Sequence, residues 1–425
     1  MTVTIFVVSL LAAMALGMPI AFALLASGIV MMLAMGQFDP QILAQNLVGG
    51  ADSFPLLAVP FFMLAGEVMT AGGLSRRIVA LAVALCGHFR GGLGYVAIAA
   101  AVLMASMSGS AVADTAAIGA ILIPMMRQGG YQLGRASGLI ASGGIIAPMM
   151  PLSIPFIVFG VTSGVSIGKL FVAGIVPGLL MAVALVVAWW FVARNEQVEP
   201  MPRASLREAL RAFVDGFWAL LVPVIVLGGI KAGVFTPTEA AVVAAVYSLF
   251  ISMVVYRELK PSQLYGVFLA AGKMTAVVMF LVAAAGVSAW LITIADLPMM
   301  VADLLQPFVD SKILLMLIIM LIVVAVGTAL DLLPTILILT PVLMPIVKQA
   351  GIDPVYFGVL FILNNAIGLI TPPVGTVLNV ISGVAKIPLD ETIRGAIPFL
   401  IAHLLLLLLL TLFPALVMVP MRWFL

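Results

Sequence analysis

The chain has 425 residues, of which 64% are hydrophobic and only 8% are charged, and its mean hydropathy is +1.31. A soluble domain carries about 25% charged residues, so this composition excludes an ordinary soluble protein. The net charge of +2 says little by itself. We expect no nucleic-acid partner. The single cysteine, Cys86, excludes an intramolecular disulfide and a cysteine-based zinc site. The two histidines, His88 and His403, are far apart in sequence, which argues against a histidine-based metal site.

Apolar runs of about 20 residues, each long enough to cross a bilayer, recur along the chain. They predict one all-α polytopic membrane protein over residues 1–425, with about 11–12 membrane helices. The first run, residues 3–35, is too long for a signal-peptide core and lacks a basic leader. We expect it to remain as a membrane segment that bends near Gly17 and Pro19.

The most hydrophilic stretch, residues 194–211, contains four arginines. Basic loops remain in the cytoplasm, so this stretch is predicted to be a cytoplasmic linker. The next span reaches Lys231, and "TPTEAA" then predicts a helix start, with Pro237 early and Glu239 in the first turn. That helix leads back to a second basic stretch, residues 256–260. Both basic stretches are then on the cytoplasmic side of the membrane, so the predicted crossings are consistent with each other.

The chain contains an internal repeat. "IPMMRQGGY" (residues 123–131) aligns with "MPIVKQAGI" (residues 344–352) at a shift of 221 residues, and the same shift places Pro151 on Pro372. The two halves cover roughly residues 50–175 and 270–390, and we expect them to be inverted. Repeated halves whose hydrophobic segments are interrupted at corresponding places indicate a secondary transporter.

Each half contains two interrupted segments. They are "SMSGSAVAD" (106–114) and "SGGIIAPMMPLS" (142–153) in the first half, and "GTALDLLPT" (327–335) and "GLITPPVGTVLN" (368–379) in the second. Gly and Pro break a helix and free its carbonyl groups, while Ser and Thr add neutral oxygens. Such oxygens suit a hard cation such as Na⁺, and the opened helix N-termini suit the carboxylate of a substrate.

The Gly and Pro residues of the interrupted segments also have structural explanations that involve no ion or substrate. Small residues such as Gly109, Gly143 and Gly144 also permit close helix packing in a membrane. The paired prolines Pro148, Pro151, Pro372 and Pro373 are explained less well by packing alone.

Ionisable residues in apolar segments are functional candidates. Here they are Glu67, Asp114, Lys273 and Asp331. We expect Asp331 to lie near an ion site, whereas Asp114 either holds the ion or holds the hairpin tip. Glu67 and Lys273 are expected to be a structural pair or helix-end residues.

The motifs "SGSAVADTAAIGAILIPMM", "GLIASGGIIAPMMPLSIPF" and "DPVYFGVLFILNNAIGLITPPVGTVLNV" resemble the large membrane subunit of the tripartite ATP-independent periplasmic (TRAP) transporters. The resemblance extends over essentially the whole chain. It implies a scaffold and a mobile transport domain that moves as an elevator, with two re-entrant hairpins near residues 100–124 and 327–347. It also implies uptake driven by Na⁺, with no other cofactor, of a carboxylate, for example a sugar acid such as 2,3-diketo-L-gulonate.

The implied partners are a small four-helix membrane subunit, a periplasmic substrate-binding protein and the lipid bilayer of the bacterial inner membrane. Two Na⁺ and substrate regions follow from matching the motifs residue by residue. The first comprises Ser106, Ser108, Ser110, Asp114, Gly143, Ile146 and Pro148. The second comprises Gly327, Thr328, Asp331, Thr371, Pro372 and Gly375.

Three other functions are weighed against this one. A self-sufficient Na⁺/carboxylate symporter of related architecture would need no binding protein. A membrane-embedded hydrolase would need a nucleophile with a base, or a metal, and one cysteine with two scattered histidines offers little for either. A channel agrees less well with the matched breaks, which indicate alternating access. We therefore expect a transporter and not an enzyme.

Overall fold

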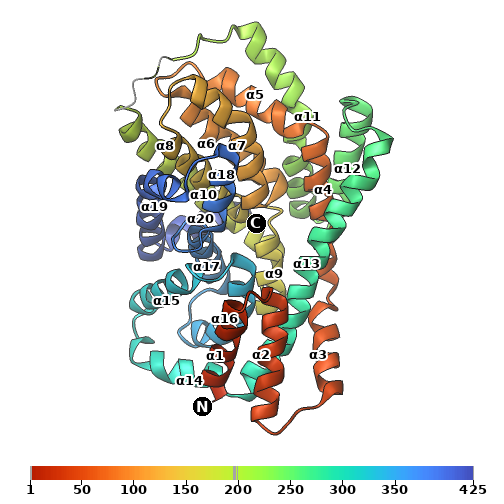
Figure 1. Cartoon of the computed structure of the whole chain (residues 1–425), viewed down its shortest axis with the longest axis vertical. Helices are drawn as coiled ribbons and strands as arrows, with labels where there is room; N and C mark the ends of the chain where they lie inside the picture. The colour runs from red at the N-terminus through yellow and green to blue at the C-terminus, as the bar shows by residue number, and fades with distance from the viewer. Residues whose placement is uncertain (1, 195–197, 199, 425) are drawn as a thin grey trace.

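The structure, a computed structural model, describes residues 2–194, 198 and 200–424. Within these residues the chain forms helices and no strand, so the predicted all-helical fold is confirmed. Figure 1 shows the helices stacked along the long axis of the molecule, with α5, α6, α7 and α8 towards one end and α1, α14, α15 and α16 towards the other.

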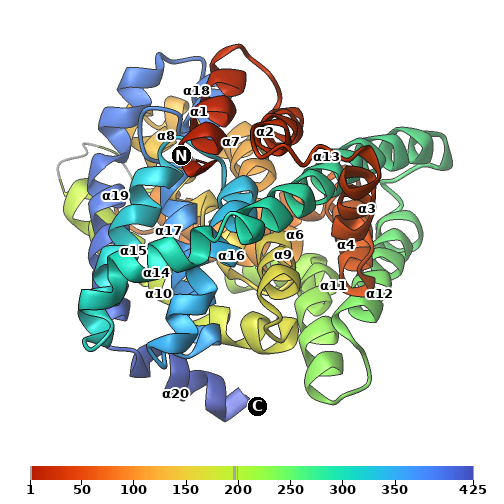
Figure 2. The same cartoon turned by 90° about the horizontal axis from the view of Figure 1, so that it is seen from below.

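One set of helices, which we name the peripheral group, comprises α1 (Thr2–Ala15), α2 (Ile20–Ala34), α3 (Pro40–Ala51), α4 (Ala58–Ala71), α11 (Leu206–Lys231), α12 (Pro237–Phe250) and α13 (Pro261–Ile294). A short turn of helix, η1 (Phe54–Leu57), precedes α4, and a π-helical turn, η3 (Ile251–Val255), extends α12. The long helix α13 packs along α2, α3 and α4, and Figure 2 shows it crossing the molecule beside them.

A second set, which we name the central group, comprises α6 (Gly92–Ser108), α7 (Ala111–Gln128), α8 (Leu133–Gly144), the short turn η2 (Ala147–Met149), α9 (Ile154–Ser163), α10 (Ile167–Ala193), α15 (Lys312–Gly327), α16 (Leu332–Gln349), α17 (Pro354–Gly368), α18 (Thr376–Ala385), α19 (Leu389–Leu412) and α20 (Ala415–Phe424). Shorter elements connect the two groups: α5 (Leu74–Cys86), α14 (Leu297–Leu305) and η4 (Gln306–Phe308). The groups meet where α13 contacts α16 and where α4 contacts α6 and α9.

Seven helices among the described residues are long and apolar enough to cross a membrane. The pair formed by residues 133–149 and 154–163, bent by 42°, raises this number to eight, and six further apolar helices have 10–17 residues. The chain is therefore a multi-pass membrane protein. The expected 11–12 spans depend on how many of the shorter helices also cross, so that number stays a prediction.

Local sequence explains where the helices begin. Thr236 caps α12: its hydroxyl accepts from the Glu239 backbone N–H (3.3 Å), and the Glu239 carboxylate accepts from the Thr236 N–H (2.8 Å). This confirms the predicted helix start at "TPTEAA". Near the N-terminus, α1 ends at Ala15 and α2 begins at Ile20, so the chain bends at the predicted place, where Gly17 takes a left-handed conformation.

A similar capping box changes the extent of the predicted linker over residues 194–211. Ser205 and Glu208 cap each other's backbone, so α11 begins at Leu206 and the last six linker residues are helical. The reason is that this local cap satisfies the first free N–H groups of the helix. Positions 195–197 and 199 of the predicted linker lie outside the described residues.

The helix bounds keep the register of the sequence repeat. The first and last residues of α7 are each followed 221 positions later by the first and last residues of α16. In both halves a helix break precedes these elements, at Gly109–Ser110 and at Thr328–Asp331. The flanking helices extend beyond the predicted hairpins, from Gly92 to Gln128 and from Lys312 to Gln349. The division into two inverted halves stays a prediction.

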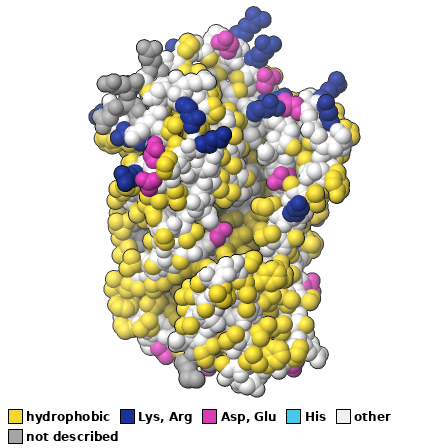
Figure 3. Space-filling model, viewed as in Figure 1, with side chains coloured by type: hydrophobic (Ala, Val, Ile, Leu, Met, Phe, Trp, Pro, Cys, Tyr) yellow, Lys and Arg dark blue, Asp and Glu magenta, His cyan; other side chains and the backbone are white. Residues whose placement is uncertain are grey.

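The helices of the central group approach one another closely. A Cβ added to Gly138 of α8 would lie 2.4 Å from the backbone N of Ala396 in α19, and one added to Gly395 would lie 2.0 Å from the Gly134 carbonyl oxygen. Small residues that allow such contact favour helix packing in lipid, where the hydrophobic effect between helices is absent. On the surface, Figure 3 shows Lys and Arg gathered at the end that carries α5 and the start of α11, with apolar side chains below them.

Candidate functional site

The first break separates α6 from α7. Gly109 follows the last residue of α6 with a left-handed φ of 63°, and Ser110 caps α7 by accepting from the Ala113 N–H at 3.3 Å. A Cβ on Gly109 would lie 2.8 Å from the Leu152 carbonyl oxygen. Only glycine meets both demands at low cost, so the tip of this hairpin packs directly on the segment that joins α8 to α9.

A polar cluster lies just behind this tip. The Ser108 hydroxyl donates to Asp114 Oδ1 at 2.5 Å and accepts from the Ser110 N–H at 3.2 Å. Asp114 is 2% exposed, and its second oxygen, Oδ2, has no hydrogen-bond partner among the described residues. Ser106 instead donates to the Leu103 carbonyl of its own helix at 2.7 Å. Of the predicted serines here, Ser108 is therefore the one that connects the hairpin to a carboxylate.

The second break separates α15 from α16 and has different chemistry. Asp331 caps α16, and its Oδ1 accepts from the Leu332 N–H at 2.9 Å. Thr328 donates to the Ala325 carbonyl at 2.8 Å, so its hydroxyl is engaged within its own helix. Gly327 ends α15 against α17, because a Cβ on Gly368 would lie 2.6 Å from the Gly327 carbonyl oxygen.

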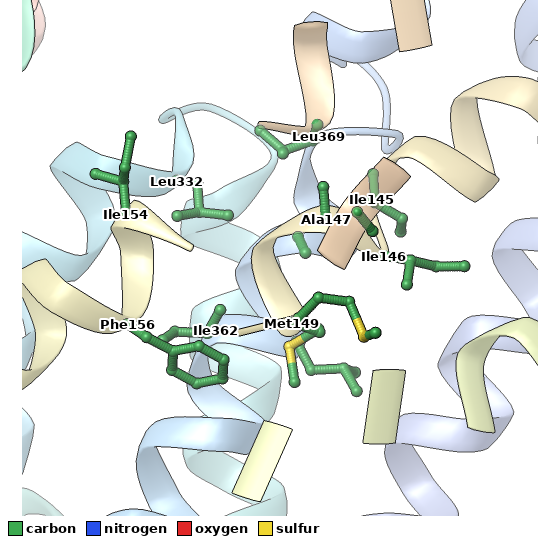
Figure 4. Packing of buried hydrophobic residues seen from close by; sticks show 14 of the residues in the cluster. Ile145, Ile146, Ala147, Met149, Ile154, Phe156, Leu332, Ile362 and Leu369 are labelled. Carbon is green, nitrogen blue, oxygen red and sulfur yellow. The ribbon is translucent and has the colours of Figure 1, made fainter. Parts of the chain in front are cut away.

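The two other interruptions are the connections between α8 and α9 and between α17 and α18. Between α8 and α9 the chain passes through Ile146 and Pro148 and turns at Leu152, which has a φ of 76°. Ala147 and Ile154 belong to the same cluster of buried hydrophobic residues as Leu332 and Leu369 of the second half, and Figure 4 shows these four side chains in that cluster. Gly143 faces α6, where a Cβ would lie 3.0 Å from Ala101 Cβ.

Between α17 and α18 the chain carries the other predicted residues of the second region. Thr371 donates to the Ile367 carbonyl at 2.8 Å, the Pro372–Pro373 bond is cis, and Gly375 has a φ of 43° before α18 begins. Thr371 is half-buried, and Pro372 is exposed. These residues form a loop at the surface of the central group, whereas the α8–α9 connection is buried.

One cavity of about 670 Å³ brings the two hairpin tips together. Its wall contains the starts of α7 and α16, one residue from each second interruption (Pro148 and Leu369), the start of α2 and the middle of α13. Of the predicted site residues, Ser110, Pro148 and Asp331 line it. The other predicted residues are not part of its described wall.

Some buried polar groups near the breaks were not among the predicted site residues. Asn364 and Asn365 of α17 are buried, and each has an Oδ1 without a hydrogen-bond partner among the described residues. Their amide N–H groups donate to the Met320 and Phe361 carbonyls at 2.7 and 2.8 Å. Thr115 is also buried next to Gly144. An adjacent pair of Asn residues in an apolar helix was a signal available in the sequence.

Glu67 and Lys273 do not form the structural pair that was one of the two expectations. No hydrogen bond or ion pair between them exists in the described structure. Glu67 lies in the second half of α4, and Lys273 lies within the membrane-length helix α13, where it is exposed. Lys273 shares a helix face with Ala276 and Val277, which line the cavity.

A polytopic helical protein in which interrupted helices from two parts of the chain surround one cavity has the architecture of a secondary transporter. The sequence comparison is more specific. Residues 7–416 match the family described as "Tripartite ATP-independent periplasmic transporter, DctM component", and the chain belongs to this family of TRAP transporter large permeases. The family prediction made from the motifs is confirmed.

The chain is 58% identical over 423 residues, with all of both chains covered, to the 2,3-diketo-L-gulonate TRAP transporter large permease protein YiaN of Escherichia coli (strain K12). It is 40% identical to the sialic acid TRAP transporter large permease protein SiaM of Vibrio cholerae, over 94% of this chain and 93% of that one. The crystal structure of the YdaH transporter of Alcanivorax borkumensis matches with a TM-score of 0.61 at 15% identity. That match covers 87% of this chain and 86% of the other, and it shows a shared fold.

Proposed function

We propose that this chain is the large permease of a Na⁺-coupled TRAP transporter for a carboxylate that a periplasmic binding protein delivers. The observation that carries the proposal is the cavity of about 670 Å³ into which the N-termini of α7 and α16 both open. Each N-terminus has free N–H groups and a partial positive charge, which stabilises an anion by about 0.3 to 1 kcal/mol or more where partly buried. Two such termini at one cavity suit a carboxylate.

The balance of charge at this cavity supports cation coupling. Asp331 is the only carboxylate in its described wall, and that wall contains no Lys, Arg or His. An anionic substrate beside Asp331 therefore needs a compensating cation, and Na⁺ binds through oxygen ligands like other hard cations. Ser108, Ser110, Asp114 and the carbonyls of the α8–α9 connection would serve one Na⁺ region, and Asp331, Thr328 and the Thr371–Gly375 loop would serve the other.

The relatives suggest the substrate and the setting. We propose a sugar acid, with 2,3-diketo-L-gulonate as the first candidate, because the 58% identity to YiaN extends over the full chain. The partners would be a small four-helix membrane subunit and the binding protein. In the bacterial inner membrane, the basic end seen in Figure 3 would face the cytoplasm. The central group would move as an elevator against the peripheral group, a proposal supported by the breaks, all of which belong to the central group.

The test is uptake into proteoliposomes that contain this chain and its small subunit, with labelled 2,3-diketo-L-gulonate and purified binding protein outside. An inward Na⁺ gradient should drive accumulation, and an equal K⁺ gradient should not. Omission of the binding protein should reduce uptake to the level of empty liposomes. Uptake by this chain alone would instead identify a self-sufficient symporter. Accumulation driven by the K⁺ gradient would contradict Na⁺ coupling.

A further inference from the structure

A second cavity, of about 740 Å³, lies away from the transport cavity, between α6 and α10. Its volume falls within the range of about 300 to 1,000 Å³ that is typical of ligand sites. Two helical stripes form its walls. The lining residues of α6 follow its first one at spacings of three, four, seven and eight positions, and those of α10 at four and eight, so each stripe is one face of a helix. The lining residues are Tyr95, Ile98, Ala99, Val102 and Leu103 of α6, Ala182, Val186 and Trp190 of α10, and Cys86, Phe89 and Arg90.

The two helices run antiparallel, and their contacts fix the geometry of this groove. The end of α10 meets the start of α6, where the buried Trp189 donates from Nε1 to the Gly91 carbonyl at 2.9 Å. A Cβ on Gly94 would lie 2.0 Å from the Trp189 ring, so the helices are in direct contact there. The eight helical rises of about 1.5 Å from Tyr95 to Leu103 give the groove a length of about 12 Å.

The groove changes in character along its length. Its deep end, at Leu103 and Ala182, is aliphatic, and its outer end is formed by the aromatic rings of Tyr95, Trp190 and Phe89. Phe89 and Trp190 are 50% and 47% exposed. Aromatic side chains with this combination of contact and exposure are typical of the level where lipid head groups begin.

Two guanidinium groups lie at this outer end. Arg90 Nη2 donates to the Arg194 carbonyl at 3.3 Å, and the Arg194 guanidinium carbon lies 3.5 Å from the centre of the Trp190 ring. Arg90 lines the groove, and no Asp or Glu is present in its described wall. Arginine binds phosphate oxygens well because its planar group offers several donors in a fixed arrangement.

We propose that this groove binds one anionic phospholipid. An acyl chain would lie between the stripes of α6 and α10, and the phosphate would contact Arg90 with Arg194 beside it. The two positive charges, with no acidic residue in the described part of the wall, favour an anionic head group over a zwitterionic one. A wholly polar ligand such as free phosphate would leave the aliphatic deep end unoccupied, so the whole groove fits a lipid better.

The position of this lipid connects it to the first hairpin. The groove runs along the outer face of α6, and this helix ends at Ser108 in the transport site. Leu103, at the deep end, has a carbonyl group that accepts from Ser106, one turn before the tip. A bound lipid therefore fills the space between α6 and α10 and stabilises the helix that carries the tip.

Native mass spectrometry of the full chain, released from nanodiscs with equal amounts of phosphatidylglycerol and phosphatidylethanolamine of matched acyl chains, tests the proposal. The wild type should retain phosphatidylglycerol about tenfold more often than phosphatidylethanolamine. Arg90→Gln should remove most of this preference, whereas Arg90→Lys should keep part of it. Arg207→Gln, at the start of α11 and outside the groove, is the matched control and should behave like the wild type.

A second variant tests the acyl-chain part of the groove without changing any charge. Ala99→Trp places a bulky ring between the stripes and should reduce retention of both lipids about tenfold. Equal retention of the two lipids by the wild type would overturn the anionic assignment. Equal effects of Arg90→Gln and Arg207→Gln would remove the assigned phosphate position, and full retention by Ala99→Trp would place the lipid elsewhere. If Arg90→Gln does not fold, the lipid retention of Ala99→Trp and the lipid preference of the wild type still test the proposal.

Discussion

The two hairpin tips occupy corresponding places in the chain but carry their carboxylates differently. Ser110 caps α7 and Asp331 caps α16, and these positions are 221 residues apart. In the first tip the carboxylate is Asp114, buried four residues beyond the cap and bonded to Ser108. In the second tip the carboxylate is the cap itself, and Asp331 lines the cavity.

The first tip is also packed more tightly than the second. Gly109 and Gly144 admit no Cβ, because one would lie 2.8 Å from the Leu152 carbonyl oxygen and the other 1.8 Å from Thr115 Oγ1. A Cβ on Gly327, in contrast, would meet its nearest neighbours at 3.7 Å, an ordinary contact. The first tip is thus fixed by backbone packing with its charge enclosed, and the second has more space and a charge open to the cavity. This comparison predicts that each tip fails through a different kind of substitution.

The largest effect is expected at the open carboxylate. Asp331→Asn removes the only carboxylate of the described cavity wall but keeps a residue that caps helices as well as Asp. We expect Na⁺-dependent uptake to fall about 100-fold, equivalent to about 2.7 kcal/mol, with little change in thermal stability. Uptake by the reconstituted three-component system measures the effect.

The matched control is Asp353→Asn. Asp353 caps α17 by accepting from the Val355 and Tyr356 N–H groups, and it lies outside the transport cavity. This variant should transport like the wild type. Equal losses in the two variants would show that the effect belongs to helix capping and not to the cavity charge.

The next effect concerns the two glycines. Gly109→Ala adds a Cβ in a left-handed conformation and against the Leu152 carbonyl, which together should destabilise the fold by about 2 kcal/mol or more. Gly327→Ala adds a methyl group at the end of α15 where space exists, and alanine favours helix by about 0.5 to 1 kcal/mol over glycine. Thermal unfolding in detergent should therefore show a lower midpoint for the first variant and an unchanged or higher one for the second.

Much of this arrangement was visible in the sequence. Residues that break helices, such as Gly109 and Pro148, and local caps such as Thr236 with Glu239 act over a few positions, so they predict where elements start and end. The match of α7 to α16 follows from the same local signals repeated 221 residues later. The motifs were specific enough to identify the family before any packing was known.

Most of the cavity wall could not be predicted from the sequence. The start of α2 and the middle of α13 contribute apolar residues such as Phe22 and Val278, whose sequence patterns are those of ordinary membrane helices. Their role depends on how helices far apart in the chain pack. The same limit applies to Asp114 and Asp331, because which of them is enclosed depends on distant segments that pack around each tip, such as Leu152 against Gly109.

The Ser108–Asp114 hydrogen bond makes a third, smaller prediction about the enclosed carboxylate. If the pair acts as one unit, Ser108→Ala and Asp114→Asn should each raise the Na⁺ concentration for half-maximal uptake about tenfold, or about 1.4 kcal/mol. The double variant should then be little worse than either single one, because residues in direct contact are not additive. Effects that add in full would show that the two side chains act separately.

The smallest effect comes from making the first tip resemble the second. Ser110→Asp preserves the cap of α7, since Asp and Ser cap helices about equally well, so stability should change by less than about 0.5 kcal/mol. It also adds a second negative charge to the cavity that Asp331 lines, and this charge repels an anionic substrate by about 1 kcal/mol in a hydrated site. We expect the KM for the carboxylate to rise a few-fold with little change in the maximal rate.

Ser166→Asp is the matched control, because Ser166 caps α10 in the same manner, accepts from the Lys169 N–H at 3.4 Å and lies outside the cavity. It should leave the KM unchanged. A KM that stays constant in Ser110→Asp as well would mean that the substrate carboxylate does not approach the N-terminus of α7. In that case only the second tip, with α16 and Asp331, would contact the transported anion.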